Sequence, residues 1–352
     1  MDTVKLYYEN AFLQDFTATV ESCEAVKGGF AVTLNRTAFY PEGGGQPADH
    51  GTLGDARVLD VHEKNGVVTH LCDRALSVGA AVDGRIDWTR RFDHMQQHSG
   101  EHIVSGMLCS AFHCDNVGFH MGADVVTIDY NADIPWAQVL EIERRANAYI
   151  WEDHPVEIRY PSPEELAALP YRSKKELTGQ VRIVTIPGAD VCACCGTHTA
   201  ATGQVGQIKI LTSENYKGGV RLSVVCGGRA LREAQAMRSR QADIGALLSA
   251  KADQTAVAVH RVYDEYTALK FAHFGLCSQL FDALAAQLGP DETAIRTVPG
   301  LDPDGLHRLA ARLSEATTGL CAALTPSEKG TGYCIAVSYT HLRAHETTLH
   351  LV

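Results

Sequence analysis

The sequence lacks long hydrophobic runs, a basic leader segment and an excess of basic charge. No apolar stretch approaches the ~20 residues of a membrane-spanning helix, which excludes a helical membrane protein. The first residues, MDTVKLYYENAFLQDF, are acidic and mixed, so we expect no signal peptide. The net charge of −11 disfavours binding of nucleic acid by the chain as a whole, although local basic patches can still bind a phosphate backbone.

The sequence also lacks the regular cysteine spacing of a disulfide framework. Its eleven cysteines are irregularly spaced, and three of them stand almost together at Cys192, Cys194 and Cys195. Free thiols that can bind metal are typical of a reducing compartment, so we expect a cytoplasmic protein. The hydrophobic content of 45% and the charged content of 21% are ordinary for a globular protein, and the length suffices for two or three domains.

The last residues of the chain need separate treatment. Residues 337–347 read VSYTHLRAHET, which resembles the translation of a transposase-based sequencing-library adaptor. We therefore expect residues 337–352 to be an adaptor artefact and exclude His341, His345 and His350 from the candidate ligands. We also expect the natural chain to continue beyond residue 336, so that its C-terminal domain is truncated here.

The region 1–90 is expected to form short strands. Pairs of β-prone segments flank the turn signals KGG at 27–29 and NG at 65–66, which favour hairpins. Between the hairpins, three consecutive glycines at 43–45 indicate either an ordinary long turn or close approach to a bulky group. We predict a small N-terminal β domain with a barrel-like sheet.

Beyond residue 90 the pattern becomes mixed. In the region 91–228, helical patterns start at Asp93, Pro135 and Pro163. Strand patterns lie between and after these helices, at 125–130, 155–160, 181–186, 205–211 and 220–225. In the region 229–336, about fifty residues have helical spacing and a small α/β segment follows. The predicted fold class is therefore α+β: a β domain, an α+β domain, long helices and a truncated α/β domain.

Two four-residue spacings carry most of the functional information. Residues four apart on a helix lie on one face, so His98 and His102 can bind a single ion. Cys194 and His198 would supply the other ligands from a glycine-containing loop. Either pair alone is also typical of a merely polar surface, but three imidazoles and one thiolate together suit Zn²⁺, so we predict one zinc ion per chain.

Four segments resemble one known family. They are TAFYPEGGGQPADHG at 37–51, HMQQHSGEH at 94–102, CACCGTHTA at 192–200 and TGQVGQIKI at 202–210. In order and separation they resemble the editing domain of alanyl-tRNA synthetase and its freestanding relatives, the AlaX-type alanyl-tRNA editing proteins. The resemblance covers roughly residues 1–228, and the rest is similar to the helical connector and C-terminal domain of the same proteins. No aminoacylation domain precedes the motifs, so we expect a trans-acting editor.

The resemblance implies roles for individual residues. It assigns the zinc to the same four ligands, and it assigns substrate binding to a glycine-rich loop. A position in the pocket wall falls on Phe119 or His120, where the alignment is ambiguous by one residue. The chain departs from the synthetase pattern at Cys195, where that pattern has glycine, and Cys192 is an additional thiol. The residues of the glycine-rich loop are Gly43, Gly44, Gly45 and Gln46.

The resemblance implies a zinc-dependent hydrolase that deacylates tRNA(Ala) mischarged with serine or glycine. A pocket built for alanine discriminates weakly against serine and cannot exclude the smaller glycine, so a second site must hydrolyse the wrong ester. No residue is assigned with certainty to catalysis; the candidates are Thr37, Gln46 and His120. Thr37 and Gln46 could bind the serine hydroxyl or could only stabilise a turn. The zinc could orient water or the substrate.

The remaining expectations concern partners. Basic clusters are candidate tRNA contacts, or else solvated faces, and the C-terminal region allows a homodimer. Two other functions stay open: a zinc-stabilised tRNA-binding module without catalysis, and a metallohydrolase of another aminoacyl ester. We expect no membrane partner. The basic residues are Arg172, Lys174, Lys175 and Arg182 in one cluster and Lys217, Arg221, Arg229, Arg232, Arg238 and Arg240 in the other, of which Arg232, Arg238 and Arg240 are the expected substrate-binding residues.

Overall fold

The computed structural model describes residues 2–173, 180–328 and 330–337. The chain is a mixed α+β protein, as the sequence predicts, and it divides into two compact units, Met1–Ser239 and Arg240–Val352. The predicted adaptor segment from residue 338 onward lies outside the described residues, as do Lys174 and Lys175. None of the described helices is long and apolar enough to cross a membrane.

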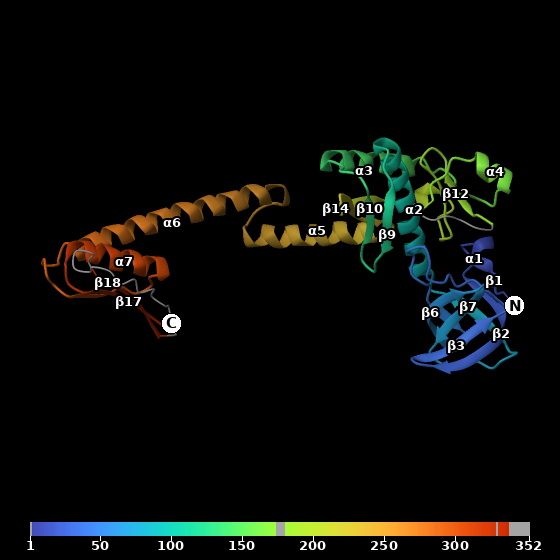
Figure 1. The fold of residues 1–352 in the computed structure, drawn as a ribbon, viewed down its shortest axis with the longest axis horizontal. Helices are drawn as coiled ribbons and strands as arrows, with labels where there is room; N and C mark the ends of the chain where they lie inside the picture. The colour runs from blue at the N-terminus through green and yellow to red at the C-terminus, as the bar shows by residue number, and fades with distance from the viewer. Residues whose placement is uncertain (1, 174–179, 329, 338–352) are drawn as a thin grey trace. The chain divides into compact units, whose positions relative to one another are not determined.

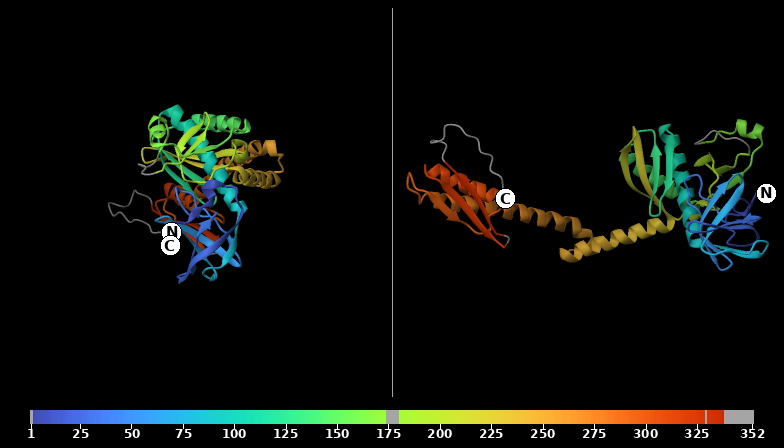
Figure 2. Two further views of the ribbon diagram at one scale, coloured as in Figure 1. Left: turned by 90° about the vertical axis from the view of Figure 1, so that its right-hand side faces the viewer. Right: turned by 60° about the horizontal axis from the view of Figure 1, so that its bottom comes forward.

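The first unit begins with a closed barrel, drawn in blue in Figures 1 and 2. Its strands follow the spatial order β2-β3-β7-β6-β5-β8. The two expected hairpin turns are present, since Gly28 and Gly66 both have positive φ angles, of 96° and 81°. Val32, Leu34 and Val68 fill the interior. The bounds are β2 (Asp15–Val26), β3 (Gly29–Leu34), β5 (Gly51–Leu53), β6 (Ala56–Lys64), β7 (Val67–Cys72) and β8 (Ala81–Ile86), with β1 (Val4–Lys5), α1 (Leu6–Glu9) and β4 (Arg36–Thr37) beside them.

A long helix, α2 (Trp88–Phe112), connects the barrel to the rest of the unit. It starts five residues before the expected Asp93, because the carboxylate of Asp87 accepts a hydrogen bond from Arg90 N and caps the first turn. Arg91 joins the helix to the barrel: its guanidinium is fully buried, pairs with Asp49 and donates to the Ala38 carbonyl. This contact fixes α2 against the barrel.

α2 packs on an antiparallel sheet with the strand order β14-β15-β10-β9. The core between them contains Ile103, Leu108, Ile128, Leu222 and Val224, all almost fully buried. The strand β9 was not predicted, because Gly118 interrupts its apolar pattern. The bounds are β9 (Asn116–Met121), β10 (Val126–Tyr130), α3 (Trp136–Trp151), η1 (Thr202–Val205), β14 (Ile208–Tyr216) and β15 (Gly219–Cys226).

A small sheet beside α2 carries the cysteine-rich segment. Its strands are β11 (Glu157–Arg159), β12 (Ile183–Ile186) and β13 (Asp190–Ala193), and α4 (Pro163–Ala168) lies between the first two in sequence. β13 was expected to be loop. It pairs antiparallel with β12, with Cys192 opposite Val184, and it ends directly before Cys194. The sheet therefore fixes the start of the cysteine loop.

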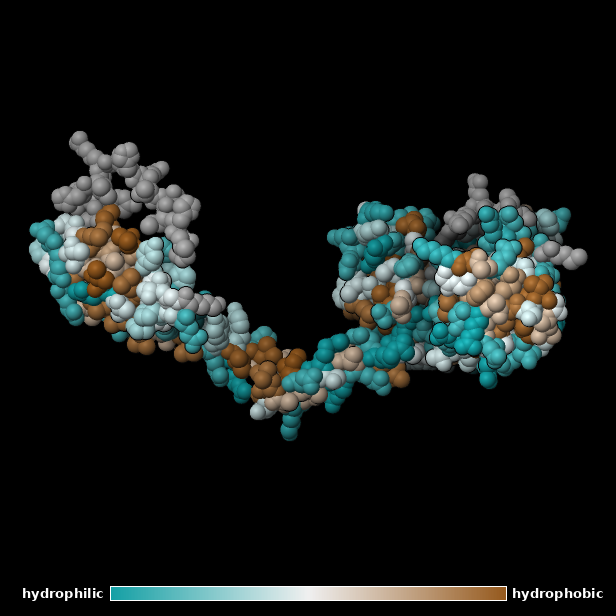
Figure 3. All heavy atoms as spheres, turned by 90° about the horizontal axis from the view of Figure 1, so that it is seen from below, coloured by the Kyte–Doolittle hydropathy of each residue, from teal (hydrophilic) through white to brown (hydrophobic). Residues whose placement is uncertain are grey.

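The remaining helices and strands reach into the second unit. The predicted run of about fifty helical residues is broken, because α5 (Gly227–Leu247) ends before Ser249, which has a φ of 50°, and α6 (Thr255–Ala285) follows. A sheet of β16 (Ala294–Thr297), β17 (Cys321–Ser327) and β18 (Gly330–Ala336) packs with α7 (Pro303–Ala316) around Leu309 and Leu313. Figure 3 shows apolar side chains in brown at the surface around α6, where Tyr266, Leu269 and Phe271 are exposed.

Candidate metal centre

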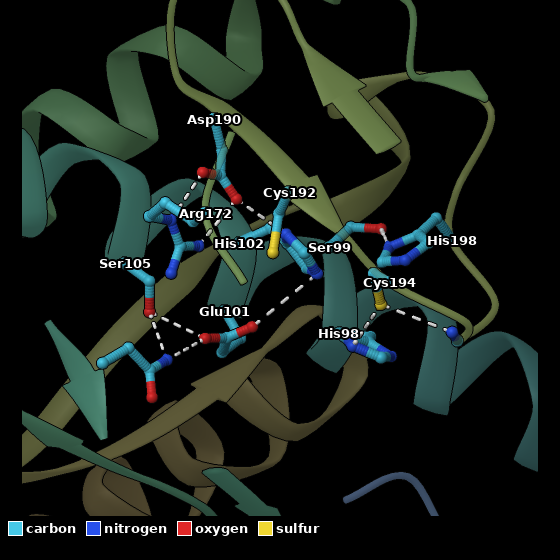
Figure 4. A network of polar contacts seen from close by, with 12 residues as sticks. His98, Ser99, Glu101, His102, Ser105, Arg172, Asp190, Cys192, Cys194 and His198 are labelled. Atoms are coloured by element: carbon cyan, nitrogen blue, oxygen red, sulfur yellow. Dashed lines mark hydrogen bonds and ion pairs between the residues drawn. The ribbon is translucent and has the colours of Figure 1, made fainter. Parts of the chain in front are cut away.

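Two histidines of α2 and two residues of the loop after β13 converge in the first unit (Figure 4). We call His98, His102, Cys194 and His198 the metal cluster. Cys194 Sγ lies 3.4 Å from His98 Nε2, and the ring centroids of His98 and His198 are 4.6 Å apart. One ligand atom from each of the four residues lies within 4.8 Å of the others, and the three imidazoles are almost completely buried. The structure thus brings together the four residues that the spacings indicate.

Neighbouring residues contact the outer nitrogen of each of the three imidazoles, and for His198 the partner is Ser99 Oγ, 3.5 Å from Nδ1. Gln46 Oε1 accepts a hydrogen bond of 2.8 Å from His98 Nδ1, and it must be an acceptor because Thr197 N also donates to it. Asp190 Oδ2 accepts from His102 Nδ1 at 2.7 Å. The rings of His98 and His102 therefore both carry a proton on Nδ1, and Nε2 is the nitrogen turned toward Cys194 that would bind a metal ion. A metal-binding histidine is usually oriented in this way.

The loop that carries Cys194 and His198 is held from both sides. The guanidinium of Arg182, itself 5% exposed, donates to the carbonyls of Cys194 and Gly196 at 2.8 and 3.0 Å. Gly196 is required for space, since a Cβ atom there would lie 2.1 Å from His98 Cε1. Cys195 points to the surface and is exposed. The loop therefore presents Cys194, and not Cys195, to the histidines.

The electrostatic environment distinguishes the two neighbouring thiols. Burial would raise the pKa of Cys194, but the adjacent His98 and a hydrogen bond from His102 outweigh it and hold that pKa well below its usual value. Burial lowers the pKa of His198 to about 3, so its imidazole is neutral. By contrast, burial raises the pKa of Cys192 to about 11. Cys194 is thus a thiolate and Cys192 a thiol at neutral pH, and only the thiolate is a good metal ligand.

These donors fit a zinc ion. The Nε2 atom of His198 is buried and has no hydrogen-bond partner among the described residues, which is a costly arrangement unless a ligand binds there. Three imidazole nitrogens and one thiolate are a tetrahedral donor set suited to zinc. A second group, His102 with Asp190 and Cys192, lies on the outer side of the His102 ring. It orients that ring and shares its only histidine with the metal cluster.

The glycine-rich loop forms a tight turn beside the metal cluster. Gly43 and Gln46 exchange two backbone hydrogen bonds, and the two residues between them, Gly44 and Gly45, have φ angles of 60° and 84°. Two positive φ angles are what a type I′ turn requires, and glycine adopts them without strain. Phe119 packs against Gly45 and stacks on the His98 ring at 5.2 Å. Gln46 and Phe119 therefore link this turn to the metal cluster.

The other candidate residues lie in different surroundings. The hydroxyl of Thr37 is buried in the barrel, 2.8 Å from His70 Nε2, and also accepts a hydrogen bond from Phe39 N. His120 is exposed on β9, whereas its neighbour Phe119 faces the metal cluster, because successive residues of a strand point to opposite faces. Among the described residues, no hydrogen bond joins Thr37 or His120 to the metal cluster.

Several candidate RNA contacts form hydrogen bonds and ion pairs within the protein. Arg172 forms two hydrogen bonds of 2.7 Å with Asp190, and Arg182 holds the cysteine loop. Arg221 pairs with Asp129 and stacks on Tyr216, and Arg229 pairs with Asp93. Charge patterning could not separate these residues from surface arginines, because their partners are distant in sequence. Arg232 and Arg238 are exposed on α5, which also carries Arg240.

Asp190 and Glu101 are site residues that sequence reasoning did not identify. Asp190 was part of a segment read as loop, and no spacing related it to His102. Glu101 is buried next to His102 on α2 and accepts a hydrogen bond from Ser105 Oγ (Figure 4). Ser105 Oγ also lies 2.8 Å from Tyr130 OH. Its buried network supports α2 directly behind the metal cluster.

Most of the chain is similar to known proteins. Residues 181–223 match the family described as threonyl and alanyl tRNA synthetase second additional domain, and residues 2–90 match tRNA synthetases class II (A). The chain is 31% identical over 310 residues to the alanyl-tRNA editing protein Aarsd1 of Bos taurus, an alignment that spans 82% of this chain and 70% of that protein. It is 34% identical over 237 residues to the alanyl-tRNA editing protein AlaX-L of Pyrococcus horikoshii, covering 64% of this chain and 59% of that protein. The alanine–tRNA ligase of Natronomonas pharaonis is 33% identical over 361 residues, which span 96% of this chain and 38% of the ligase.

Proposed function

The chain belongs to the family of alanyl-tRNA editing proteins, and from this we propose that it hydrolyses tRNA(Ala) mischarged with serine or glycine, with one zinc ion bound at the metal cluster. Members of this family are aminoacyl-tRNA deacylases, enzymes that cleave the ester between an amino acid and the terminal ribose. The identity of the mischarged amino acid and the need for zinc are the parts that we propose.

The observation that carries the proposal is the turn beside the metal cluster. The backbone N–H groups of Gly44 and Gly45 donate no hydrogen bond within the described part of the chain, and both residues are exposed. Attack of water on an ester carbonyl places negative charge on the carbonyl oxygen, and fixed N–H donors stabilise that charge. The turn is therefore suited to bind the oxyanion while the ester lies next to Phe119 and His98.

The metal cluster would supply the second part of the chemistry. A zinc ion held by these four residues would supply Lewis-acid chemistry to the ester only by taking water or a substrate group as a fifth ligand, or by release of one of the four. Gln46 has a positioning role in this proposal: its side-chain oxygen accepts from His98 and from Thr197 N, and its amide donates to Thr197 Oγ1. It thus couples the glycine turn to the ligand loop. We assign it to this role in place of a contact with the serine hydroxyl.

An enzyme that removes serine and glycine from tRNA(Ala) is needed because a binding pocket for alanine selects poorly against amino acids of similar or smaller size. A pocket for alanine admits glycine, and it rejects serine poorly because one added hydroxyl changes binding by only a few kcal/mol. Thr37 and His120 remain proposals as substrate contacts. Since both lie apart from the metal cluster, we expect their substitution to affect hydrolysis less than substitution of Gln46.

A single-turnover deacylation series tests the proposal. The full chain is mixed in excess with tRNA(Ala) charged with serine, glycine or alanine, and release of the amino acid is followed over time. We expect rapid release of serine and glycine, and release of alanine close to the uncatalysed rate. Binding of all three charged tRNAs without release of any amino acid would contradict the proposal and favour a zinc-stabilised RNA-binding module.

A further inference from the structure

A second site lies one helical turn from the metal cluster in the first unit. It is a pocket of about 370 Å³ at the junction of the barrel, the start of α2, the β9–β10 turn and the start of α5. Arg90, His94 and Arg232 line it, together with Pro47, Gly122 and Arg229. Arg232 is one of the expected substrate-binding residues, but no motif in the sequence predicts the pocket itself.

The pocket has a net positive charge, because three arginines line it against the two carboxylates of Asp87 and Asp93. Asp93 is bound by Arg229, with three contacts of 2.7 to 3.1 Å, and Asp87 accepts from Arg90 N as the cap of α2. The side chain of Arg90 donates one hydrogen bond to the described residues, from Nε to the Ala48 carbonyl at 2.9 Å. The terminal nitrogens of Arg90 thus remain as donors. Arg232 reaches only to 4.0 Å from Asp93, and its side chain is 68% exposed.

A buried histidine adds a further unsatisfied group. His94 is 2% exposed, and its Nδ1 has no hydrogen-bond partner among the described residues. Burial and then the neighbouring Arg90 and Arg229 lower its pKa to about 3, so the imidazole is neutral and carries one N–H. Buried polar groups without a partner are rare in folded proteins, and a ligand in the adjoining pocket would supply the missing partner of His94.

The pocket and the metal centre share the same three structural elements. His94 precedes His98 by four residues on α2, about 6 Å along the helix axis. Pro47 directly follows Gln46, and Gly122 follows the strand that carries Phe119. Each of these three elements thus has residues at the metal centre and nearby residues in the pocket. A ligand that reaches both must carry a reactive ester and an anionic group a short distance apart.

We propose that this pocket binds the phosphate on the 5′ side of the terminal adenosine of a charged tRNA while the aminoacyl ester lies at the metal centre. The inference rests on the proposed function, which places the ester there. In any aminoacyl-tRNA the ribose that carries the amino acid has a phosphate at its 5′ oxygen, so the two groups are separated by one sugar. The guanidinium groups of Arg90 and Arg232 and the N–H of His94 match the acceptor oxygens of a phosphate.

The test compares two probes that cannot be hydrolysed, 3′-deoxy-3′-(L-serylamino)adenosine with and without a 5′-phosphate. Calorimetry with the full chain gives the Kd of each probe at constant salt. We expect the phosphate to tighten binding about tenfold or more, the effect of a hydrogen bond between charged groups. This ratio should fall toward one in Arg90→Gln and in Arg232→Gln. It should persist in Arg145→Gln, which removes an exposed arginine of α3 outside the pocket.

A ratio near one in the wild-type chain would overturn the proposal, and so would a ratio that persists in the Arg90→Gln/Arg232→Gln double variant. Failure to bind either probe would overturn it as well. The wild-type ratio needs no variant, and Arg232 is exposed, so a folding defect does not decide the result. If the ratio behaves as expected but seryl-tRNA(Ala) is not hydrolysed, the pocket assignment stands and the proposed function falls.

Discussion

The carboxylate of Asp190 lies 2.7 Å from Nδ1 of His102, and Arg172 binds the same carboxylate with two further hydrogen bonds. Burial alone would raise the pKa of Asp190, but the hydrogen bonds from His102 and Arg172 outweigh it and lower that pKa. Asp190 is therefore a charged acceptor that fixes the proton of His102 on Nδ1. This leaves Nε2 as the nitrogen of His102 that would bind a metal ion, with loss of its proton.

The first prediction follows from this contact. Asp190→Asn should weaken zinc binding about 10- to 100-fold, because the neutral amide no longer holds the imidazole in one tautomer. Competition with a chelator measures the affinity. Asp129→Asn is the matched control, since Asp129 also binds an arginine, Arg221, through two hydrogen bonds but lies away from the metal cluster. Equal zinc affinities in the two variants would show that Asp190 has no such role.

The second prediction concerns the glycine turn. Gly44→Ala and Gly45→Ala both place a side chain at positive φ, which costs about 1 kcal/mol each. Only at Gly45 would the new Cβ collide with Phe119, at 2.6 Å, while nothing lies within 4 Å at Gly44. Gly45→Ala should therefore displace Phe119 and lower the single-turnover rate with seryl-tRNA(Ala) at least about tenfold more than Gly44→Ala, a barrier difference of about 1.4 kcal/mol.

Similar rates in the two glycine variants would mean that Phe119 does not need this close contact. Zinc content should be the same in both variants, since neither glycine belongs to the metal cluster. A loss of zinc in Gly45→Ala would instead indicate that the turn acts through Gln46 on His98.

These contacts show which parts of the site could be predicted from sequence. The pairs His98–His102 and Cys194–His198 are local, and helical periodicity places the first pair on one face before any tertiary structure is known. The acceptors Gln46 and Asp190 lie 52 and 88 residues from their histidines, and no short-range pattern encodes such distances. Those contacts depend on how α2 docks between the barrel and the small sheet.

The fold shows the same division. The barrel hairpins were predictable because Gly28 and Gly66 occupy turn positions that need positive φ. The break between α5 and α6 was not, because no proline marks it and Ser249 adopts the left-handed conformation instead. β13 was missed because its four residues are too few to show alternation, and it becomes a strand through pairing with β12.

The third prediction concerns the stability of the barrel as a function of pH. His70 is fully buried, and burial lowers its pKa from 6.5 to about 4. Below pH 6.5 the unfolded chain binds a proton that the folded barrel does not, so stability present above that pH is lost as the pH falls toward 4. The loss attributable to His70 between pH 7 and pH 5 should be about 2 kcal/mol.

Urea unfolding at pH 7 and pH 5 measures this loss in the wild type and in His70→Gln, which removes the titrating group. The variant should lose less stability than the wild type over this interval, even if it is less stable at pH 7. The comparison isolates His70 because His94 and His198, whose pKa values are also lowered, are present in both chains. The same loss in both chains would mean that His70 is not buried as a neutral imidazole.

The fourth prediction concerns Arg238 and Arg240 on α5. If they contact tRNA phosphates, the double variant Arg238→Gln/Arg240→Gln should weaken binding of charged tRNA and reduce the dependence of log Kd on log salt by about two units of slope. Zinc content should not change. An unchanged salt dependence would show that the two arginines form only a solvated helix face.

The central claim is that the metal cluster holds the zinc on which hydrolysis depends. The most direct measurement determines zinc content and single-turnover hydrolysis of seryl-tRNA(Ala) on the same preparations of wild type, Cys194→Ala and Cys192→Ala. We predict about one zinc per chain and rapid hydrolysis in the wild type and in Cys192→Ala, and loss of both in Cys194→Ala. A Cys194→Ala preparation that keeps a full equivalent of zinc, or that hydrolyses the ester at the wild-type rate, would contradict the account.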